Sequence, residues 1–340
     1  MTRAPRPTLA SLTLTVLLLA FAITTVASSD AHADPKVLKL ATLAPKGSDW
    51  ETAFRRADKK IREKTANGVE LRIYAGGVMG DEQAMVRKMR TGQIDAGAVT
   101  GVGLGEINQE LLVMQLPFLF RNYTELDYVR DHMSGTLAKL LEDKGFVLLT
   151  WGDVGFQYLF SSSPITSLAD ARAAKMWVWD ADPISKKVME LGKINATPLG
   201  VPDVLPGLTT GLVNAFLNSP YGAVALQWST KAKYIMDVKL AFVTGGVVIS
   251  KASWNALTDA ERAAVRDAFK EEGIQLLADI RKANDAAQKR LLTKDGYKAS
   301  PVTDISDWLK LGDDVRAALT GTLFPKALID ELLGHLKQAH

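Results

Sequence analysis

Residues 37–100 alternate between short β-rich runs and longer helical stretches, and this order constrains the fold more than any other feature of the chain. Three runs have the length and composition of strands: Val37–Leu43, Val69–Tyr74 and Ile94–Thr100. After the first run, Ser48 and Glu51 stand at the spacing of a capping box, which begins a helix. This β-α-β-α-β order predicts a parallel sheet with right-handed crossovers, so we expect an α/β protein.

A second group of strands is expected between Gly155 and Pro220. Its three pieces are Gly155–Gln157, Lys175–Trp179 and Gly211–Asn218. Alternate side chains of a strand share a face, so Trp177 and Trp179 point the same way. They belong to the core, or they line a cleft at the carboxyl ends of the strands, where open α/β sheets bind ligands. Because tryptophan is mostly structural, the pattern alone favours the core.

A single long helix is expected after residue 258. Thr258 and Glu261 form another capping box, and apolar residues then recur at helical spacing as far as Lys294. At a rise of about 1.5 Å per residue, this helix would be about 54 Å long. The chain has 340 residues, enough for two domains, and the helix is too long for one small domain. We therefore expect it to run across both.

Two stretches rich in glycine or proline are expected to be turns. The first is Gly101–Gly105, which also has part of the dinucleotide-binding pattern. That pattern needs a third glycine where this chain has Glu106, and the lysine of a phosphate-binding loop is missing, so nucleotide binding is disfavoured. The second expected turn is Pro198–Pro206.

The N-terminus has the features of an export signal. Basic Arg3 and Arg6 precede the apolar run Leu9–Val26, and Ala31–Ala33 is a small-residue cleavage site, so residues 1–33 are predicted to be a signal peptide. An uncleaved anchor is the alternative, and no later stretch is apolar and long enough to cross a bilayer. The chain has no cysteine, which suits a periplasmic protein without disulfides. Its formal net charge of +3 is too small to indicate a nucleic-acid partner.

Familiar catalytic patterns are missing from the sequence. His132, His335 and His340 have no partners at metal-binding spacing. There is no cysteine nucleophile and no Gly-x-Ser-x-Gly elbow. The carboxylates are scattered along helix faces that are expected to be exposed. We therefore predict a protein that is not an enzyme and that holds no metal or cofactor.

Several ordered pieces of the chain together carry a family resemblance. They are Leu38–Thr42, Ala44–Trp50, Gly80–Gln83, Thr91–Ala96, Gln115–Arg121, Ser167–Val178, Gly211–Asn218 and Val247–Lys251 leading to Trp254. Over nearly its whole mature length the chain resembles the solute-binding proteins of TRAP transporters, the DctP type. The match lies in the order and spacing of the pieces rather than in any one motif.

The resemblance implies a periplasmic-binding-protein-like α/β fold, in which two lobes close on a small organic solute around a hinge. A long helix would brace both lobes, and the protein would deliver its solute to the TRAP membrane permease subunits. The expected division is residues 34–152 plus 243–257 for lobe I, 153–242 for lobe II, and 258–340 for the long helix and the C-terminal helices that pack on both lobes.

The chain departs from this family where acid-binding members usually place two arginines. These positions are Trp177 and Gln157 here, while the ligand-contacting asparagine is retained as Asn218. A buried carboxylate without a counter-charge costs several kcal/mol, so this loss disfavours a dicarboxylate held in the usual pose. Indole surface favours an apolar, aromatic or cationic group. We expect a neutral or amphipathic solute.

The remaining candidate ligand-binding residues are Trp179, Tyr221, Ser48, Thr100 and Gly101. Three alternatives stay open at this point. The chain could bind an organic acid, such as a C4-dicarboxylate, through the non-standard basic residues Lys46, Arg121 or Lys175. It could be a ligand-binding module for a sensor or another partner protein, or it could be an enzyme built on this fold.

Overall fold

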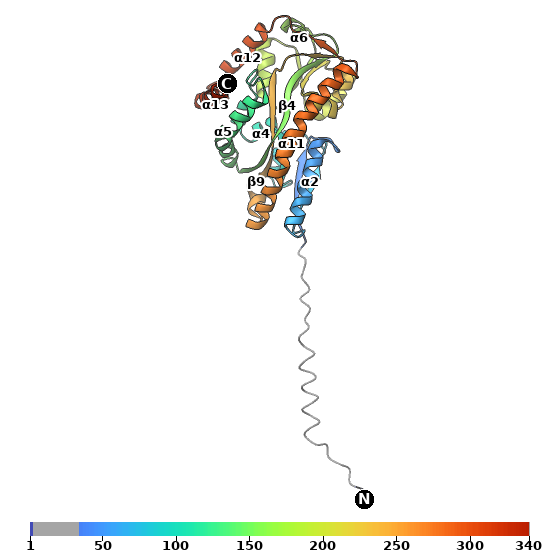
Figure 1. Cartoon of the computed structure of the whole chain (residues 1–340), viewed down its shortest axis with the longest axis vertical. Coiled ribbons are helices and arrows are strands. Elements are labelled where there is room, and N and C mark those ends of the chain that lie inside the picture. Colours follow the sequence, from blue (N-terminus) through green and yellow to red (C-terminus); the bar gives the residue numbers. More distant parts are fainter. Residues whose placement is uncertain (3–33, 340) are drawn as a thin grey trace. The chain divides into compact units, whose positions relative to one another are not determined.

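Two long antiparallel strands form the middle of a ten-stranded sheet in the computed structural model, which describes residues 1–2 and 34–339 (Figure 1). They are β4 (Phe146–Ser161) and β9 (Ala241–Ser250). Their pairing runs from Phe146 to Gln157 of β4, with register shifts between Leu148 and Thr150 and between Asp153 and Gly155. Such shifts mark β-bulges, which bend a strand and increase its twist.

The first half of the sheet lies on the β9 side, in the order β2-β1-β3-β9. Strand β1 pairs in parallel with both β2 and β3, while β3 pairs antiparallel with β9. The strands and helices of this half are β1 (Lys36–Thr42), α2 (Asp49–Lys64), β2 (Val69–Tyr74), α3 (Glu82–Arg90) and β3 (Ala96–Thr100). The predicted β-α-β-α-β order and the α/β class are confirmed. As expected, the Ser48 side chain caps α2 by accepting a hydrogen bond from the amide of Glu51.

The second half of the sheet lies on the other side of β4, in the order β4-β7-β5-β6. Strand β5 pairs in parallel with both β6 and β7, and β7 pairs antiparallel with β4. This half contains α6 (Leu168–Ala173), β5 (Met176–Trp179), α7 (Pro183–Gly192), β6 (Ala196–Leu199), α8 (Val201–Thr210), β7 (Ala215–Asn218), α9 (Pro220–Ala225) and the 3₁₀ turn η2 (Trp228–Lys231). Strand β8 (Tyr234–Met236) joins β4 to β10 (Lys298–Ser300) at the margin.

Both segments that were expected to be turns contain helices, so those two predictions are wrong. Helix α4 (Gly101–Ile107) occupies the glycine-rich stretch, and a Cβ at Gly103 would lie 2.6 Å from the Val99 Cβ. The glycine is therefore required for close packing rather than for a turn. Helix α8 begins with proline in its first turn, where the missing N–H is harmless, and continues through Pro206.

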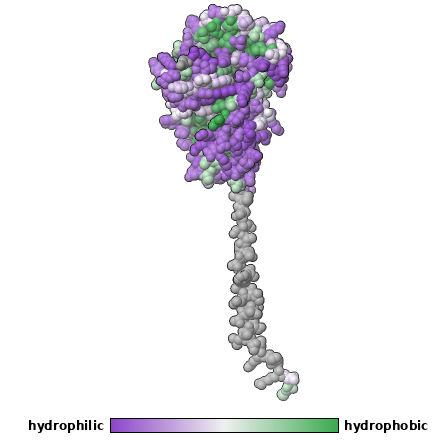
Figure 2. Space-filling model, viewed as in Figure 1, coloured by the Kyte–Doolittle hydropathy of each residue, from purple (hydrophilic) through white to green (hydrophobic). Residues whose placement is uncertain are grey.

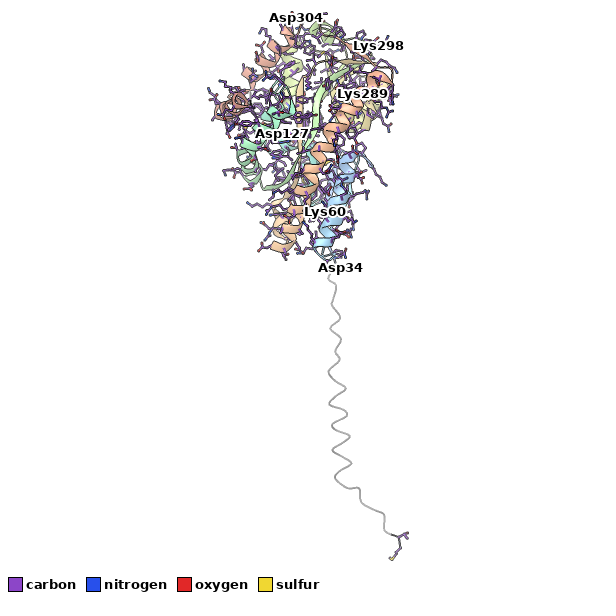
Figure 3. The ribbon with its side chains drawn as sticks, in the orientation of Figure 1. Asp34, Lys60, Asp127, Lys289, Lys298 and Asp304 are labelled. Carbon is purple, nitrogen blue, oxygen red and sulfur yellow. The ribbon has the colours of Figure 1, made fainter. Side chains whose placement is uncertain are left out.

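Helix α11 (Asp259–Thr293) is the predicted long helix, and it contacts both halves of the sheet. Against the first half, Lys60 of α2, labelled in Figure 3, pairs with Glu272 at 2.7 Å. The surface over this part of α11 and α2 is mostly hydrophilic (Figure 2). Against the second half, Asn284 accepts a hydrogen bond of 3.0 Å from the amide of Tyr221. Gly273 does not break the helix. Its missing side chain makes room for Thr150, whose Oγ1 would lie 2.0 Å from an added Cβ.

The remaining elements pack around this framework. They are the 3₁₀ helix η1 (Gln109–Gln115), α5 (Tyr123–Glu142), α10 (Lys251–Asn255), α12 (Ser306–Leu319) and α13 (Lys326–Gln338). Across the described part of the chain, no helix has the length and hydropathy needed to cross a membrane. The predicted signal peptide lies, apart from its first two residues, outside the described residues.

A buried ionic network ties α5, β4 and α11 together at the second register shift. The Asp153 side chain is 0% exposed and accepts from Arg130 at 2.6 Å and from Arg281 at 2.9 Å. Asp127 of α5, labelled in Figure 3, accepts from the same two arginines, at 2.7 Å from Arg130 and at 2.6 Å from the Nη2 of Arg281. A buried charge is strongly destabilising when its partner is removed, so this network fixes the position of α11 on the sheet.

We predict that Arg281→Met lowers the free energy of unfolding by about 3 kcal/mol or more, because it leaves the Asp153 charge buried with one partner fewer. Arg290→Met is the matched control on the same helix, since Arg290 is 63% exposed and pairs with Asp295. It should change stability by less than about 0.5 kcal/mol. Urea unfolding of the two variants measures the difference. Equal effects would show that the buried network does not stabilise the fold.

Candidate functional site

A cavity of about 240 Å³ lies where several strands end. Its lining includes Thr42 and Thr100, the last residues of β1 and β3 in the first half of the sheet. It also includes Trp179 and Asn218, the last residues of β5 and β7 in the second half. Ligands of open α/β sheets bind at the carboxyl ends of strands, so this cavity has the expected position of a binding site.

Tryptophan dominates the wall of this cavity. Six of the chain's seven tryptophans line it: Trp50, Trp151, Trp177, Trp179, Trp228 and Trp308. The ring centroids of Trp177 and Trp179 are 6.3 Å apart, and Trp228 meets Trp177 edge-to-face at 5.0 Å. Trp177 and Trp179 are only 7% and 8% exposed, so they are buried and line the cavity at the same time.

Hydrogen bonds within the protein already use the N–H groups of this tryptophan pair. The Trp177 Nε1 donates to the carbonyl of Leu199 at 3.0 Å. The Trp179 Nε1 donates to Asp81 Oδ2 at 2.8 Å. What these two residues offer a bound molecule is therefore ring surface, which suits apolar, aromatic or cationic groups.

Three side-chain carboxamides supply polar groups to the lining: Gln115, Gln157 and Asn218. The Asn218 Oδ1 accepts from the amide of Ser219 at 2.8 Å. The Gln115 side chain is 5% exposed, and its Oε1 has no hydrogen-bond partner among the described residues. A carboxamide both donates and accepts, so these groups match neutral polar groups of a solute.

The sequence analysis did not identify Gln115 as a site residue. The glycine at position 101 is the only local indication of it, because a larger residue there would collide with the Gln115 side chain. A Cβ at Gly101 would lie 2.4 Å from the Gln115 Cδ. Gly101 itself does not line the cavity, so its function is to leave room for the Gln115 amide. Other lining residues were also missed, among them Trp50, Glu82, Trp151, Trp228 and Trp308. They lie far apart in the sequence and belong to no common motif.

The described residues that line the cavity include no lysine, arginine or histidine. Lys46 is exposed, Lys175 donates to the carbonyl of Gly211 at 3.3 Å, and Arg121 donates to Glu125 at 2.7 Å; none of the three belongs to the lining. The arrangement therefore does not support the alternative in which these three residues bind an organic acid.

The acidic side chains of the lining are all engaged within the protein: Glu82, Asp153 and Asp182. Glu82 accepts from the amide of Thr100 at 2.7 Å, from the Thr100 hydroxyl at 2.8 Å and from the amide of Gly103 at 2.7 Å. Burial raises the pKa of Glu82 to about 7, against the hydrogen bonds, which lower it. Asp182 caps α7 by accepting from the amide of Ile184 at 2.9 Å.

Two of the predicted site residues lie beside the cavity rather than in its wall: Ser48 and Tyr221. Ser48 is the cap of α2. The Tyr221 hydroxyl accepts from the amide of Asp49 at 3.0 Å, and the Tyr221 ring packs on Trp50 with centroids 4.9 Å apart. Tyr221 thus connects α9 of the second half with α2 of the first. Gly101 is not in the lining either. The cavity therefore brings together five of the eight predicted residues: Trp177, Gln157, Asn218, Trp179 and Thr100.

Comparison with known proteins identifies the family of the chain. Residues 40–313 match the model of bacterial extracellular solute-binding protein family 7, the DctP family. The chain belongs to this family. It is 26% identical over 271 residues to a solute-binding protein of Chromohalobacter salexigens, covering 78% of this chain and 76% of the relative. It is 24% identical to the 2,3-diketo-L-gulonate-binding periplasmic protein of Escherichia coli, covering 75% and 76%.

Solved structures share the fold of this DctP-family protein. A TRAP periplasmic solute-binding protein of Xanthobacter autotrophicus with bound β-D-galacturonate superimposes with a TM-score of 0.82 at 20% identity, covering 88% of this chain and 99% of that one. The galactonate-bound sugar acid binding protein of Advenella mimigardefordensis gives 0.85 at 18% identity, covering 90% and 99%. The fold is thus that of TRAP periplasmic binding proteins, and these relatives are binding proteins rather than enzymes.

We predict that Gly101→Ala destabilises the protein by about 1–3 kcal/mol, because the new methyl group overpacks the buried Gln115 amide. Gly101→Ala combined with Gln115→Ala should recover part of this loss, since the second change removes the clash. Gly135→Ala, at an exposed site in the middle of α5 with nothing near the added carbon, is the control. It should be stabilising by about 0.5–1 kcal/mol. Urea unfolding tests all three, and no recovery in the double variant would contradict the packing argument.

The raised pKa of Glu82 predicts a pH dependence of stability. Between its ordinary value of 4.5 and about 7, Glu82 holds a proton in the folded protein that the unfolded chain has released. The contribution of Glu82 to the free energy of unfolding should therefore fall as the pH rises through this range. Glu82→Gln is neutral throughout, so its stability should change less between about pH 5 and about pH 8 than that of the wild type. Superimposable pH profiles of the two proteins in urea unfolding would refute the shift.

Proposed function

We propose that this protein captures a small neutral or amphipathic organic solute in the tryptophan-lined cavity and delivers it to the membrane permease of a TRAP transporter. Membership of the extracellular solute-binding family supports the class of function. The observation that carries the choice of solute is the lining itself, which combines six tryptophans and three carboxamides with no basic side chain among the described residues.

The size of the charge effect decides against a simple carboxylate. A charge-assisted hydrogen bond contributes about 1.5–3 kcal/mol, and a guanidinium fork can make two of them. Enclosing a carboxylate without any counter-charge instead costs several kcal/mol. Gln157 and Trp177 provide no such charge, and Glu82 and Asp182 are acidic residues that cannot provide it. Burial of the solute against indole rings supplies the favourable free energy.

A sugar acid is the second candidate, and it is favoured by what the relatives hold. Two of the matching solved structures contain bound sugar acids, β-D-galacturonate in one and galactonate in the other. Here such an acid would require a basic group from outside the present lining, with Lys46, Arg121 and Lys175 as the sequence-based candidates. A C4-dicarboxylate would meet the same difficulty twice.

The two halves of the sheet are proposed to act as the two lobes of a hinge. Lobe I would comprise residues 34–152 and 243–257, and lobe II residues 153–242. The boundary at residues 152 and 153 coincides with the β4 register shift that begins at Asp153. Residues 258–340 would brace both lobes.

We further propose that residues 1–33 direct export to the periplasm and that the protein has no catalytic activity and requires no cofactor. If the protein presented its solute to a sensor protein instead of a permease, the partner would differ but the solute-binding cavity would be the same.

The solute is expected to co-purify with the protein, because a closed cavity retains its occupant. Native mass spectrometry of gently purified protein should show a mass increment that organic solvent releases as a neutral or zwitterionic small molecule. Recovery of a dicarboxylate in the cavity would refute the neutral-solute proposal. A galacturonate-like mass would favour the second candidate.

Restoring the arginines should reverse the selectivity of the cavity. Gln157→Arg and Trp177→Arg are expected to lose the co-purified solute, and Gln157→Arg should gain measurable binding of D-galacturonate in calorimetry. Trp177→Phe keeps an aromatic ring and is the matched control, which should retain the solute. Melting curves exclude unfolded variants. If both arginine variants fold and keep the native solute unchanged, the binding site lies elsewhere.

A further inference from the structure

Asp81 makes hydrogen bonds across the two halves of the sheet. It is the cap residue of α3, and its Oδ1 accepts from the amide of Glu82 at 2.9 Å within the first half. Its Oδ2 faces the second half, where it accepts from the Trp179 Nε1 at 2.8 Å and from the amide of Val201 at 3.4 Å. One carboxylate therefore joins α3, the end of β5 and the start of α8.

The surroundings of Asp81 on the second half are shaped for it. A Cβ at Gly200 would lie 3.0 Å from the Asp81 Oδ2, so a larger residue would crowd the carboxylate. Val201 begins α8, and a negative charge is favourable at the N-terminus of a helix. Burial raises the pKa of Asp81, in spite of these hydrogen bonds. A carboxylate that only capped α3 would need neither the glycine nor the indole donor.

A second contact between the halves involves different residues. Tyr221 of α9 accepts from the amide of Asp49 and packs on Trp50, as described above. Trp50 and Trp179 both line the cavity, so both of these contacts between the halves include a cavity-lining tryptophan. The wall of the cavity is thus completed by contacts between the halves.

We propose that Asp81 is a positioning residue that latches the two halves together and holds Trp179 in place as part of the cavity wall. This inference rests on the proposed function, because it assigns a role to closure over a solute. It follows that closing the cleft and assembling the aromatic wall are one event, and that the Asp81–Trp179 hydrogen bond favours the closed form.

Spin labels can measure the separation of the halves, because the chain has no cysteine of its own. Arg87→Cys on α3 and Thr209→Cys on α8 place labels at exposed sites in the two halves. Electron–electron double resonance then reports the distance distribution between the labels. In this background, Asp81→Ala and Trp179→Phe should each move population from the short distance to longer ones.

Three further variants separate a latch from a local helix cap. Asp81→Asn keeps an oxygen that accepts a hydrogen bond and should restore most of the short-distance population lost in Asp81→Ala. The Asp81→Ala, Trp179→Phe double variant should open the protein no further than either single change, because both remove the same bond. Asp170→Ala is the control, since Asp170 completes the capping box of α6 within the second half by accepting a hydrogen bond from the amide of Ser167. It should leave the distances unchanged.

The outcomes test the latch and the proposed function separately. Unchanged distances in Asp81→Ala and Trp179→Phe, or full additivity in the double variant, would overturn the latch whether or not a solute co-purifies. A small molecule in native mass spectrometry of the wild type would support the solute-binding function even if the latch failed. Opened distances in both variants, without any co-purified molecule, would support the latch and count against solute capture.

Discussion

The pairing of β4 with β9 is the constraint on which the other features of this protein depend. These two strands belong to both halves of the sheet, so the halves are covalently and physically continuous through the middle of the molecule. A register shift of β4 begins at Asp153, and two arginines neutralise the carboxylate buried there. Helix α11 is fixed at the same place, because Arg281 comes from it. The strand ends that surround the cavity are positioned by this shared centre.

Charge distribution is the basis for the proposal that this DctP-family fold binds a solute unlike an acid. The family frame supplies a cavity at strand ends, and the side chains decide which molecule is stable there. In this chain the acidic groups of the wall are satisfied by backbone amides, by the Thr100 hydroxyl or by arginines behind the wall. The carboxamides remain for directional contacts, and the indoles provide apolar area. Under the proposed function, selectivity would result from the absence of basic side chains as much as from the presence of aromatic surface.

Much of the fold could be predicted from the sequence, because local signals and tertiary packing agree. The β-α alternation, the helix caps at Ser48 and Thr258 and the long helix were correct for this reason. Prediction failed at α4 and α8, because the structural role of glycine and proline there depends on residues that are distant in sequence. At the site, the i, i+2 rule placed Trp177 and Trp179 on one face, and both line the cavity. Gln115 and Trp308 could not be found, since only the folded chain brings η1 and α12 to the same cavity.

The distribution of tryptophan has a practical consequence for optical measurements on this protein. Six of the seven indoles surround the cavity, and the seventh, Trp254, is stacked under Arg266 with the guanidinium carbon 5.0 Å from the ring centroid. The ultraviolet emission of the native chain therefore arises chiefly from the walls of one small space. A molecule that enters this space changes the polarity around most of the fluorophores at once. The intrinsic tryptophan fluorescence of the protein should therefore report whether the cavity is occupied, without any attached dye.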